Sequence, residues 1–160
     1  MTRQYIVGIA DMKQARATGT IITYALGSCI GICLYDPMIK LGAMVHIMLP
    51  EAPKNKVDNL FKYADTGIRE TLRKMEAFGA VRARMVAKIA GGAKMFDIPD
   101  SSSLGNIGER NALAVKQVLM TERIRLIKED LGANYARTMA FDVETGMAKI
   151  KVFGREEINF

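Results

Sequence analysis

The amino-acid sequence predicts an α+β domain in which β-sheets carry helices on one or both outer faces. Short apolar or β-branched runs fill the first half of the chain and return near its end, and two segments between them have helical periodicity. The length of 160 residues suits a single domain over residues 1–160. A domain of this size builds its core without disulfide or metal staples.

Four short runs in the first half predict strands over residues 4–10, 20–26, 29–35 and 41–48. Turn residues separate these runs. The clearest turn is Asp36-Pro37, because proline fixes φ and disfavours a helix in the residue before it. The runs on either side of this turn are therefore predicted to pair as a hairpin.

Two longer segments predict helices. The first spans about residues 58–78 and ends at Gly79, since apolar residues recur there at steps of three and four. These residues are Phe61, Ala64, Ile68, Leu72 and Met75. The second helix spans residues 106–122, with Asn106 as its N-cap and Glu109 as the reciprocal cap. Its inward-facing residues are Ala114, Val115, Val118 and Leu119.

Loops and further strands account for the remaining chain. Residues 49–56 and 97–105 are predicted surface loops, the second of which carries Pro99 and three serines. A strand over residues 84–90 stops at Gly91-Gly92. Three late strands follow over residues 124–128, 136–142 and 147–153, and Glu144-Thr145-Gly146 forms the turn between the last two.

Composition and charge exclude several classes of protein. The chain is 49% hydrophobic and 25% charged, as in globular rather than disordered proteins. It has no apolar run long enough for a membrane span and no secretory signal, so we expect a cytoplasmic protein without membrane insertion. The net charge of +6 could suit nucleic acid, a membrane surface or an acidic protein. Because the basic residues are scattered among acidic ones, we expect no nucleic-acid partner.

The most reactive candidate side chains are Cys29 and His46. Cys29 follows Gly27-Ser28 at a turn into a strand, where a thiol is exposed and backbone N–H groups can stabilise an oxyanion. A thiol needs a neighbouring base or cation to react at neutral pH, and His46 is the only histidine. The predicted hairpin brings it alongside the start of the Cys29 strand. From spacing alone, a cysteine that serves as a small apolar residue and a hydrogen-bonded core histidine stay open alternatives.

The second cysteine, Cys33, is predicted to be a core residue. In a strand it lies on the same face as Cys29 but about 13 Å away, at about 3.3 Å per residue. That separation prevents a disulfide or a shared metal ion. Two cysteines and one histidine are also too few for a structural zinc site, which has four ligands. We therefore expect neither a metal nor another cofactor.

A pattern of six stretches extends over nearly the whole chain. The stretches are Leu26-Gly27-Ser28-Cys29, Asp36-Pro37, and residues 42–50 (GAMVHIMLP), 62–66 (KYADT), 87–96 (AKIAGGAKMF) and 106–111 (NIGERN). In these stretches the sequence resembles the CheD family of chemoreceptor glutamine deamidases. The resemblance implies a β-sheet sandwich with flanking helices, similar to that of bacterial toxin glutamine deamidases, with the nucleophile where a strand begins.

The resemblance also implies an activity. CheD proteins hydrolyse glutamine side-chain amides on the cytoplasmic helices of methyl-accepting chemotaxis receptors, giving glutamate and ammonia through a Cys–His thioester mechanism. Their catalytic Cys, His and Thr fall on Cys29, His46 and Thr23 of this chain. Thr23 is then expected to orient the imidazole by a hydrogen bond, although a strand threonine with its hydroxyl in solvent is the alternative.

A second role follows from the same resemblance. CheD proteins also form a complex with the chemotaxis phosphatase CheC. The alternative to a deamidase is therefore a regulatory binding module that docks on CheC, with receptor methylesterase activity as a secondary function of the same thiol.

Five further residues are predicted around the reactive pair. Gly27 and Ser28 are expected near the substrate and the oxyanion, for which the N–H of Cys29 or a neighbour is the candidate donor. Gly91 and Gly92 are expected to form a tight turn on the substrate face. Phe96 is a candidate exposed anchor for a partner helix, with core packing as the alternative.

One segment departs from the CheD pattern. CheD proteins usually have paired glycines near the position of Gly132-Ala133, and another before the arginine, where this chain has Ala136-Arg137. If those positions need a positive φ, alanine is strained there. We expect this departure to change the loop rather than the reactive pair.

Overall fold

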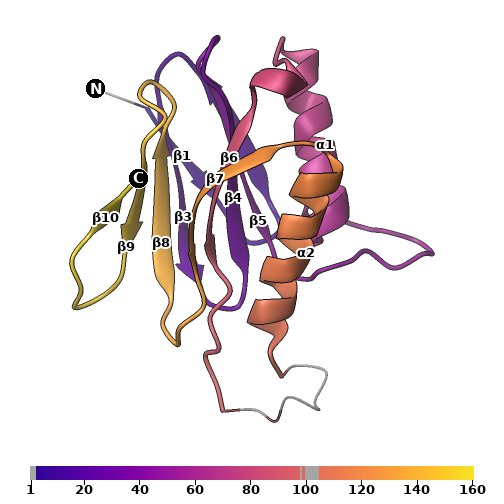
Figure 1. Ribbon diagram of the computed structural model, residues 1–160, viewed down its shortest axis with the longest axis vertical. Helices are drawn as coiled ribbons and strands as arrows, with labels where there is room; N and C mark the ends of the chain where they lie inside the picture. Colours follow the sequence, from indigo (N-terminus) through magenta and orange to yellow (C-terminus); the bar gives the residue numbers. More distant parts are fainter. Residues whose placement is uncertain (1–2, 98, 100–104) are drawn as a thin grey trace.

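The computed structural model describes residues 3–97, 99 and 105–160 and forms two stacked β-sheets with one layer of helices (Figure 1). The order in sheet A is β1 (Gln4–Val7), β3 (Thr20–Leu26), β8 (Arg137–Asp142), β9 (Ala148–Lys151) and β10 (Ile158–Asn159). The order in sheet B is β2 (Met12–Arg16), β5 (Leu41–Ile47), β4 (Ile30–Asp36), β6 (Val86–Gly91) and β7 (Arg125–Leu131). The helices are α1 (Ala64–Ala77) and α2 (Ile107–Thr121).

The predicted α+β class and sandwich are confirmed, with both helices on one outer face. Figure 1 shows α1 and α2 on the side of sheet B that faces away from sheet A. Neighbouring strands are antiparallel except for β1 with β3 and β6 with β7, which are parallel. Within the described residues, no helix combines the length and apolar character that crossing a membrane requires.

Alternating residues of the central strands separate two cores. Ile32 and Leu34 of β4 pack against the helices, whereas Cys33 between them packs in the layer between the sheets. In β5, Val45 likewise faces the helices and Met44 faces sheet A. Because both faces of sheet B are covered at its centre, every residue of β4 and β5 is buried.

The predicted hairpin is confirmed, and a buried ion pair stabilises its turn. β4 and β5 pair antiparallel on either side of residues 37–40. The fully buried carboxylate of Asp36 accepts hydrogen bonds from the Arg84 guanidinium and from the backbone N–H groups of Met38 and Val81. Burial alone would raise the pKa of Asp36, but these donors outweigh it and hold the pKa below its ordinary value.

The prediction of one strand over residues 4–10 is wrong. β1 ends at Val7 in sheet A, and the next strand, β2, begins at Met12 in sheet B. The chain changes sheets between them with Ala10 at a φ of 57°. An alanine gives no local signal for such a left-handed turn, because glycine or asparagine normally occupies it. The strands predicted over residues 20–26, 29–35 and 41–48 are confirmed as β3, β4 and β5, apart from single terminal residues.

The two predicted helices form, but both begin differently from the prediction. Asn59 caps a short 3-10 turn over Leu60–Lys62, and α1 starts only at Ala64. The helix cannot start earlier because Tyr63 is extended and bridges to Leu49. Asn106 is the N-cap position of α2, yet its backbone is left-handed and its side chain makes no cap hydrogen bond. The predicted reciprocal cap with Glu109 is therefore wrong.

The later strands are confirmed with shifted ends. The strands predicted over 84–90, 124–128, 136–142 and 147–153 correspond to β6, β7, β8 and β9. A 3-10 turn over Arg82–Arg84 precedes β6, and β7 continues to Leu131. The short strand β10 was not predicted. The three serines of the predicted loop over residues 97–105 lie outside the described residues.

Ala133 stands where CheD proteins usually have a glycine, and its φ is positive, as expected if that position needs a left-handed backbone. Its φ is 62°, whereas Ala136 is not among the residues with positive φ. We expect Ala133→Gly to raise the free energy of unfolding by about 0.5–1 kcal/mol, because the relief of about 1–2 kcal/mol of left-handed strain exceeds the cost of the greater unfolded-state entropy of glycine. Urea unfolding measures this change. Ala136→Gly is the matched control and should destabilise, so equal shifts for both variants would refute the explanation.

Candidate active site

Cys29 is a half-buried free thiol at the turn between β3 and β4. It packs against the edge of the core between the two sheets. Cys33, in contrast, is buried within that core, with its Sγ 3.9 Å from the Sδ of Met139. Both cysteines are free thiols, and the prediction that Cys33 is a core residue is confirmed.

His46 lies on the same face of sheet B as Cys29. It pairs with Gly31 in the β4–β5 ladder, so Cys29 is diagonal to it rather than directly opposite. Residues two apart along a strand share a face, and His46 follows Met44 on the side of sheet A. Diagonal positions in such a ladder are about 7–8 Å apart between Cα atoms, within reach of longer side chains. The structure therefore places the predicted pair at one end of the interlayer core.

Thr23 determines the tautomer of His46. The Thr23 side chain is fully buried, so the alternative of a hydroxyl in solvent does not occur. Its Oγ1 lies 2.8 Å from the carbonyl oxygen of Val7 and 2.7 Å from Nδ1 of His46. A hydroxyl has a single proton, and the Val7 carbonyl can only accept. Thr23 therefore donates to Val7, Nδ1–H of His46 donates to Thr23, and Nε2 is left with its lone pair.

Nε2 of His46 is buried and has no hydrogen-bond partner among the described residues. Burial lowers the pKa of His46 from 6.5 to about 4. Burial also raises the pKa of the Cys29 thiol, although the backbone N–H of Cys29 acts in the opposite direction. At neutral pH the site therefore holds a neutral thiol and a neutral imidazole whose available nitrogen can accept a proton.

The two glycines at the end of β6 contact the backbone of the Cys29 turn. The N–H of Gly92 donates to the Cys29 carbonyl at 2.9 Å. Gly91 has a φ of 122°, and a Cβ there would lie 2.1 Å from the same carbonyl oxygen. Only glycine fits this close approach. Gly91 is the last residue of β6 and does not line the neighbouring groove, whereas Gly92 does. Their role on a substrate face stays a prediction.

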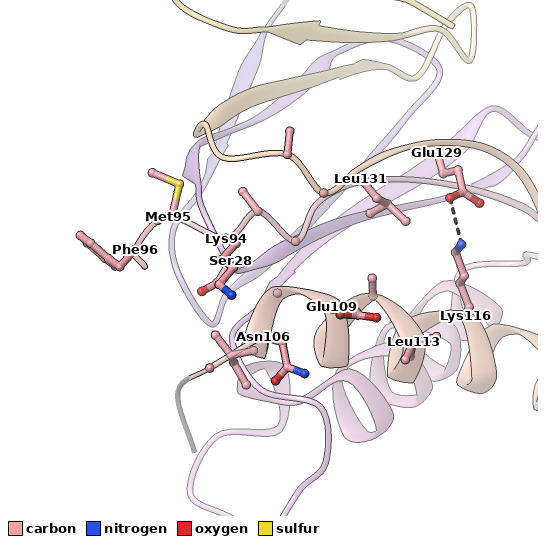
Figure 2. A pocket seen from close by; sticks show the side chains of 18 residues that line it. Ser28, Lys94, Met95, Phe96, Asn106, Glu109, Leu113, Lys116, Glu129 and Leu131 are labelled. Carbon is pink, nitrogen blue, oxygen red and sulfur yellow. Dashed lines mark ion pairs between the residues drawn. The ribbon is translucent and has the colours of Figure 1, made fainter. Parts of the chain in front are cut away.

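A groove of about 590 Å³ begins at Ser28 and runs along α2. Figure 2 shows Ser28 and Lys94 at one end and the ion pair of Lys116 with Glu129 (2.9 Å) at the other. Phe96 projects at the Ser28 end with 73% of its surface exposed, so the core alternative for this residue does not occur. Gly27 is covered by Met95 and does not line the groove.

Two polar residues near Cys29 were missed by sequence reasoning. Asn111 of α2 is fully buried and donates to the carbonyl oxygens of Ser28 and Met48. Arg137 of β8 is also buried; it pairs with Asp130 at 2.9 Å and donates to the Gly91 carbonyl at 3.4 Å. Asn111 does lie on the inward face of its helix, four residues before Val115. A polar residue at such a position is the one signal that could have identified it.

The sequence is similar to those of known proteins over most of its length. Residues 48–152 match the family described as CheD chemotactic sensory transduction. A protein of Syntrophomonas wolfei is 50% identical over 98% of each chain, and one of Clostridium botulinum is 48% identical over 92% of each. A protein of Moorella thermoacetica is 48% identical over 93% of this chain and 90% of its own. All three bear the name probable chemoreceptor glutamine deamidase CheD.

Proposed function

Because this chain belongs to the CheD family of chemotactic sensory transduction proteins, we propose that it deamidates glutamine side chains of chemoreceptors with Cys29 as the nucleophile. The observation that carries the proposal is the unpartnered Nε2 of His46, which faces the same side of sheet B as the half-buried thiol. A weak thiol acid needs such a base to become nucleophilic.

The reaction proceeds in two halves through a thioester. Nε2 of His46 takes the proton from Cys29, and the sulfur attacks the glutamine Cδ. The tetrahedral intermediate collapses when the imidazolium returns that proton to the leaving nitrogen, which departs as ammonia. Water then gives a proton to Nε2 and attacks the thioester carbon, and the thiol is released with glutamate as the product.

The proposal is tested with the purified protein and chemoreceptor cytoplasmic fragments. Each deamidated glutamine gains about one dalton as nitrogen and hydrogen are replaced by oxygen, and one ammonia is released. Peptide mass spectrometry and an ammonia assay measure both products. A wild-type protein that releases no ammonia from any receptor fragment would refute the deamidase.

Thr23→Val is expected to lower kcat by about 10²–10⁴-fold without unfolding the protein. Valine keeps the shape of threonine but cannot accept the Nδ1–H bond, so the imidazole loses its fixed tautomer and orientation. The valine also leaves the Val7 carbonyl without its partner, which is expected to lower the melting temperature slightly. Ammonia release measures kcat.

Thr23→Ser is the matched control for this effect. Serine keeps the hydroxyl that joins Val7 to His46, so we expect it to retain activity within about tenfold. Equal losses for the serine and valine variants would show that packing in β3, rather than the hydroxyl, matters.

The groove beside Ser28 supports a second candidate function, the docking of a partner helix. Its apolar walls and the exposed Phe96 at the Cys29 end suit an amphipathic helix, from either a receptor or the phosphatase CheC. The groove begins at Ser28, the residue before Cys29, so a helix bound there would lie beside the Cys29 turn. Receptor methyl esters are proposed as secondary substrates of the same thiol. Methanol release from a methylated fragment tests that secondary activity.

Phe96→Ala is expected to weaken binding of CheC or a receptor fragment at least tenfold, because exposed aromatic anchors commonly carry much of the affinity of an interface. Titration calorimetry measures the affinity. Phe153 is exposed as well but lies after β9, so Phe153→Ala is the control and should leave the affinity unchanged. Unchanged affinity in Phe96→Ala would remove Phe96 from the interface.

A further inference from the structure

Asn111 makes two hydrogen bonds whose direction is determined by their partners. Its Nδ2 lies 2.9 Å from the carbonyl oxygen of Ser28 and 2.9 Å from that of Met48. Because both partners only accept, the amide must turn its NH₂ group, and not its oxygen, toward them. Both N–H bonds are thereby used. The Oδ1 of Asn111 is buried without a partner among the described residues.

These two carbonyls lie just beyond the end of the β4–β5 ladder. The last backbone pair of that ladder is Ile30 with Ile47. Ser28 precedes Cys29 on one strand, and Met48 follows His46 by two residues on the other. The amide of Asn111 therefore joins the two strands at the point where their own hydrogen bonds stop.

Three consecutive carbonyl groups of the Cys29 turn are held in this way. The Gly27 carbonyl accepts from the N–H of Ala93, that of Ser28 from Asn111, and that of Cys29 from the N–H of Gly92. Asn111 provides the only side-chain donor among these three. The orientation of the peptide between Ser28 and Cys29 therefore depends on a single replaceable side chain.

A trans peptide directs its N–H away from its C=O, because the group is planar. The described chain has no cis peptide bonds. With the Ser28 carbonyl turned to Asn111, the N–H of Cys29 points to the opposite side. That N–H lies close enough to the sulfur of its own residue to lower the pKa of the thiol. It donates to no backbone carbonyl among the described residues. It is thus an available donor beside the reacting thiol.

We propose that Asn111 is a positioning residue that orients the N–H of Cys29 as the oxyanion donor. This inference rests on the deamidase function proposed above. In the tetrahedral intermediate the glutamine oxygen becomes negatively charged next to Sγ, where a fixed N–H donor lowers its free energy. Loss of Asn111 lets the peptide rotate and weakens that donor, whereas the thiol keeps its place just before β4 and the imidazole keeps its place in β5.

The test compares turnover with alkylation of Cys29 in Asn111→Ala. Alkylation by iodoacetamide needs the ionised thiol of Cys29 but forms no oxyanion. We expect kcat for ammonia release to fall about 10²-fold, in the range for loss of one oxyanion donor, with KM and the alkylation rate within about twofold of wild type. Asn159→Ala removes an exposed asparagine from β10 and is the control.

Three outcomes would overturn the inference. An unchanged kcat would show that Asn111 does not affect turnover. Equal losses of kcat and alkylation rate would show that it holds the thiol rather than the oxyanion donor. An inactive wild type would overturn the deamidase as well, whereas an active wild type confines the failure to Asn111. If Asn111→Ala does not fold, Asn111→Ser, which keeps one donor, undergoes the same comparison and should show a smaller loss of kcat.

Discussion

Cys29→Ala is expected to lower the rate of ammonia release by at least about 10⁴-fold. Removing the nucleophile of an acyl-transfer enzyme leaves only the contributions of binding and oxyanion stabilisation. The half-buried position of Cys29 at a turn, outside the centre of either core, means that the substitution removes few packing contacts. The variant should therefore fold and still bind CheC or receptor. Ammonia release and titration calorimetry on the same preparation measure both properties.

Cys33→Ala is the matched control. It also removes a cysteine sulfur, but from a fully buried position in the core between the sheets. The comparison therefore separates loss of a reactive thiol from loss of core packing. We expect it to retain turnover but to lower the free energy of unfolding by about 1 kcal/mol or more, because it leaves a small cavity beside Met139. If Cys29→Ala keeps its activity, or Cys33→Ala loses it while folded, the assignment of the nucleophile is wrong.

Local sequence patterns correctly predicted the helices and strands whose tertiary contacts agree with the intrinsic conformational preference of their residues. The apolar spacing from Ala64 to Met75 identified α1, and the Asp36-Pro37 turn identified the β4–β5 hairpin. The same reasoning failed where tertiary contacts decide. Ala10 adopts a left-handed turn that separates β1 from β2, and Tyr63 pairs with Leu49 instead of joining α1. Neither the turn at Ala10 nor the bridge at Tyr63 can be predicted from the spacing of nearby residues.

The reactive residues could be predicted from the sequence, whereas the residues that hydrogen-bond to the backbone around them could not. Cys29 and His46 are scarce residue types, so chemistry alone selected them, and the CheD resemblance added Thr23. Asn111 and Arg137 donate hydrogen bonds to residues distant in sequence, Ser28 and Gly91, which only the folded chain brings to them. A buried polar side chain is recognised by its partners, and those partners are backbone carbonyls that no sequence pattern marks.

The pH dependence of catalysis is expected to show an acid limb near pH 4. Burial lowers the pKa of His46 to about 4. Below that pH, Nε2 is protonated and cannot accept the thiol proton, so kcat/KM falls about tenfold for each further unit of pH. Above it, the imidazole stays neutral and kcat/KM stays level through neutral pH. His46→Gln, which has no base, should lower kcat by about 10²–10⁴-fold and remove this limb.

Alkylation of Cys29 distinguishes this neutral pair from a thiolate–imidazolium pair. Burial raises the pKa of the thiol, so its reaction with iodoacetamide should accelerate with pH throughout the neutral range and into the alkaline range. A preformed ion pair would instead react at a constant rate from mildly acidic pH upward. A level alkylation rate, or an acid limb of kcat/KM centred near 6.5, would mean that the imidazole is solvated or paired in the working enzyme. Either result would contradict a buried Nε2 that accepts its proton only as the sulfur attacks.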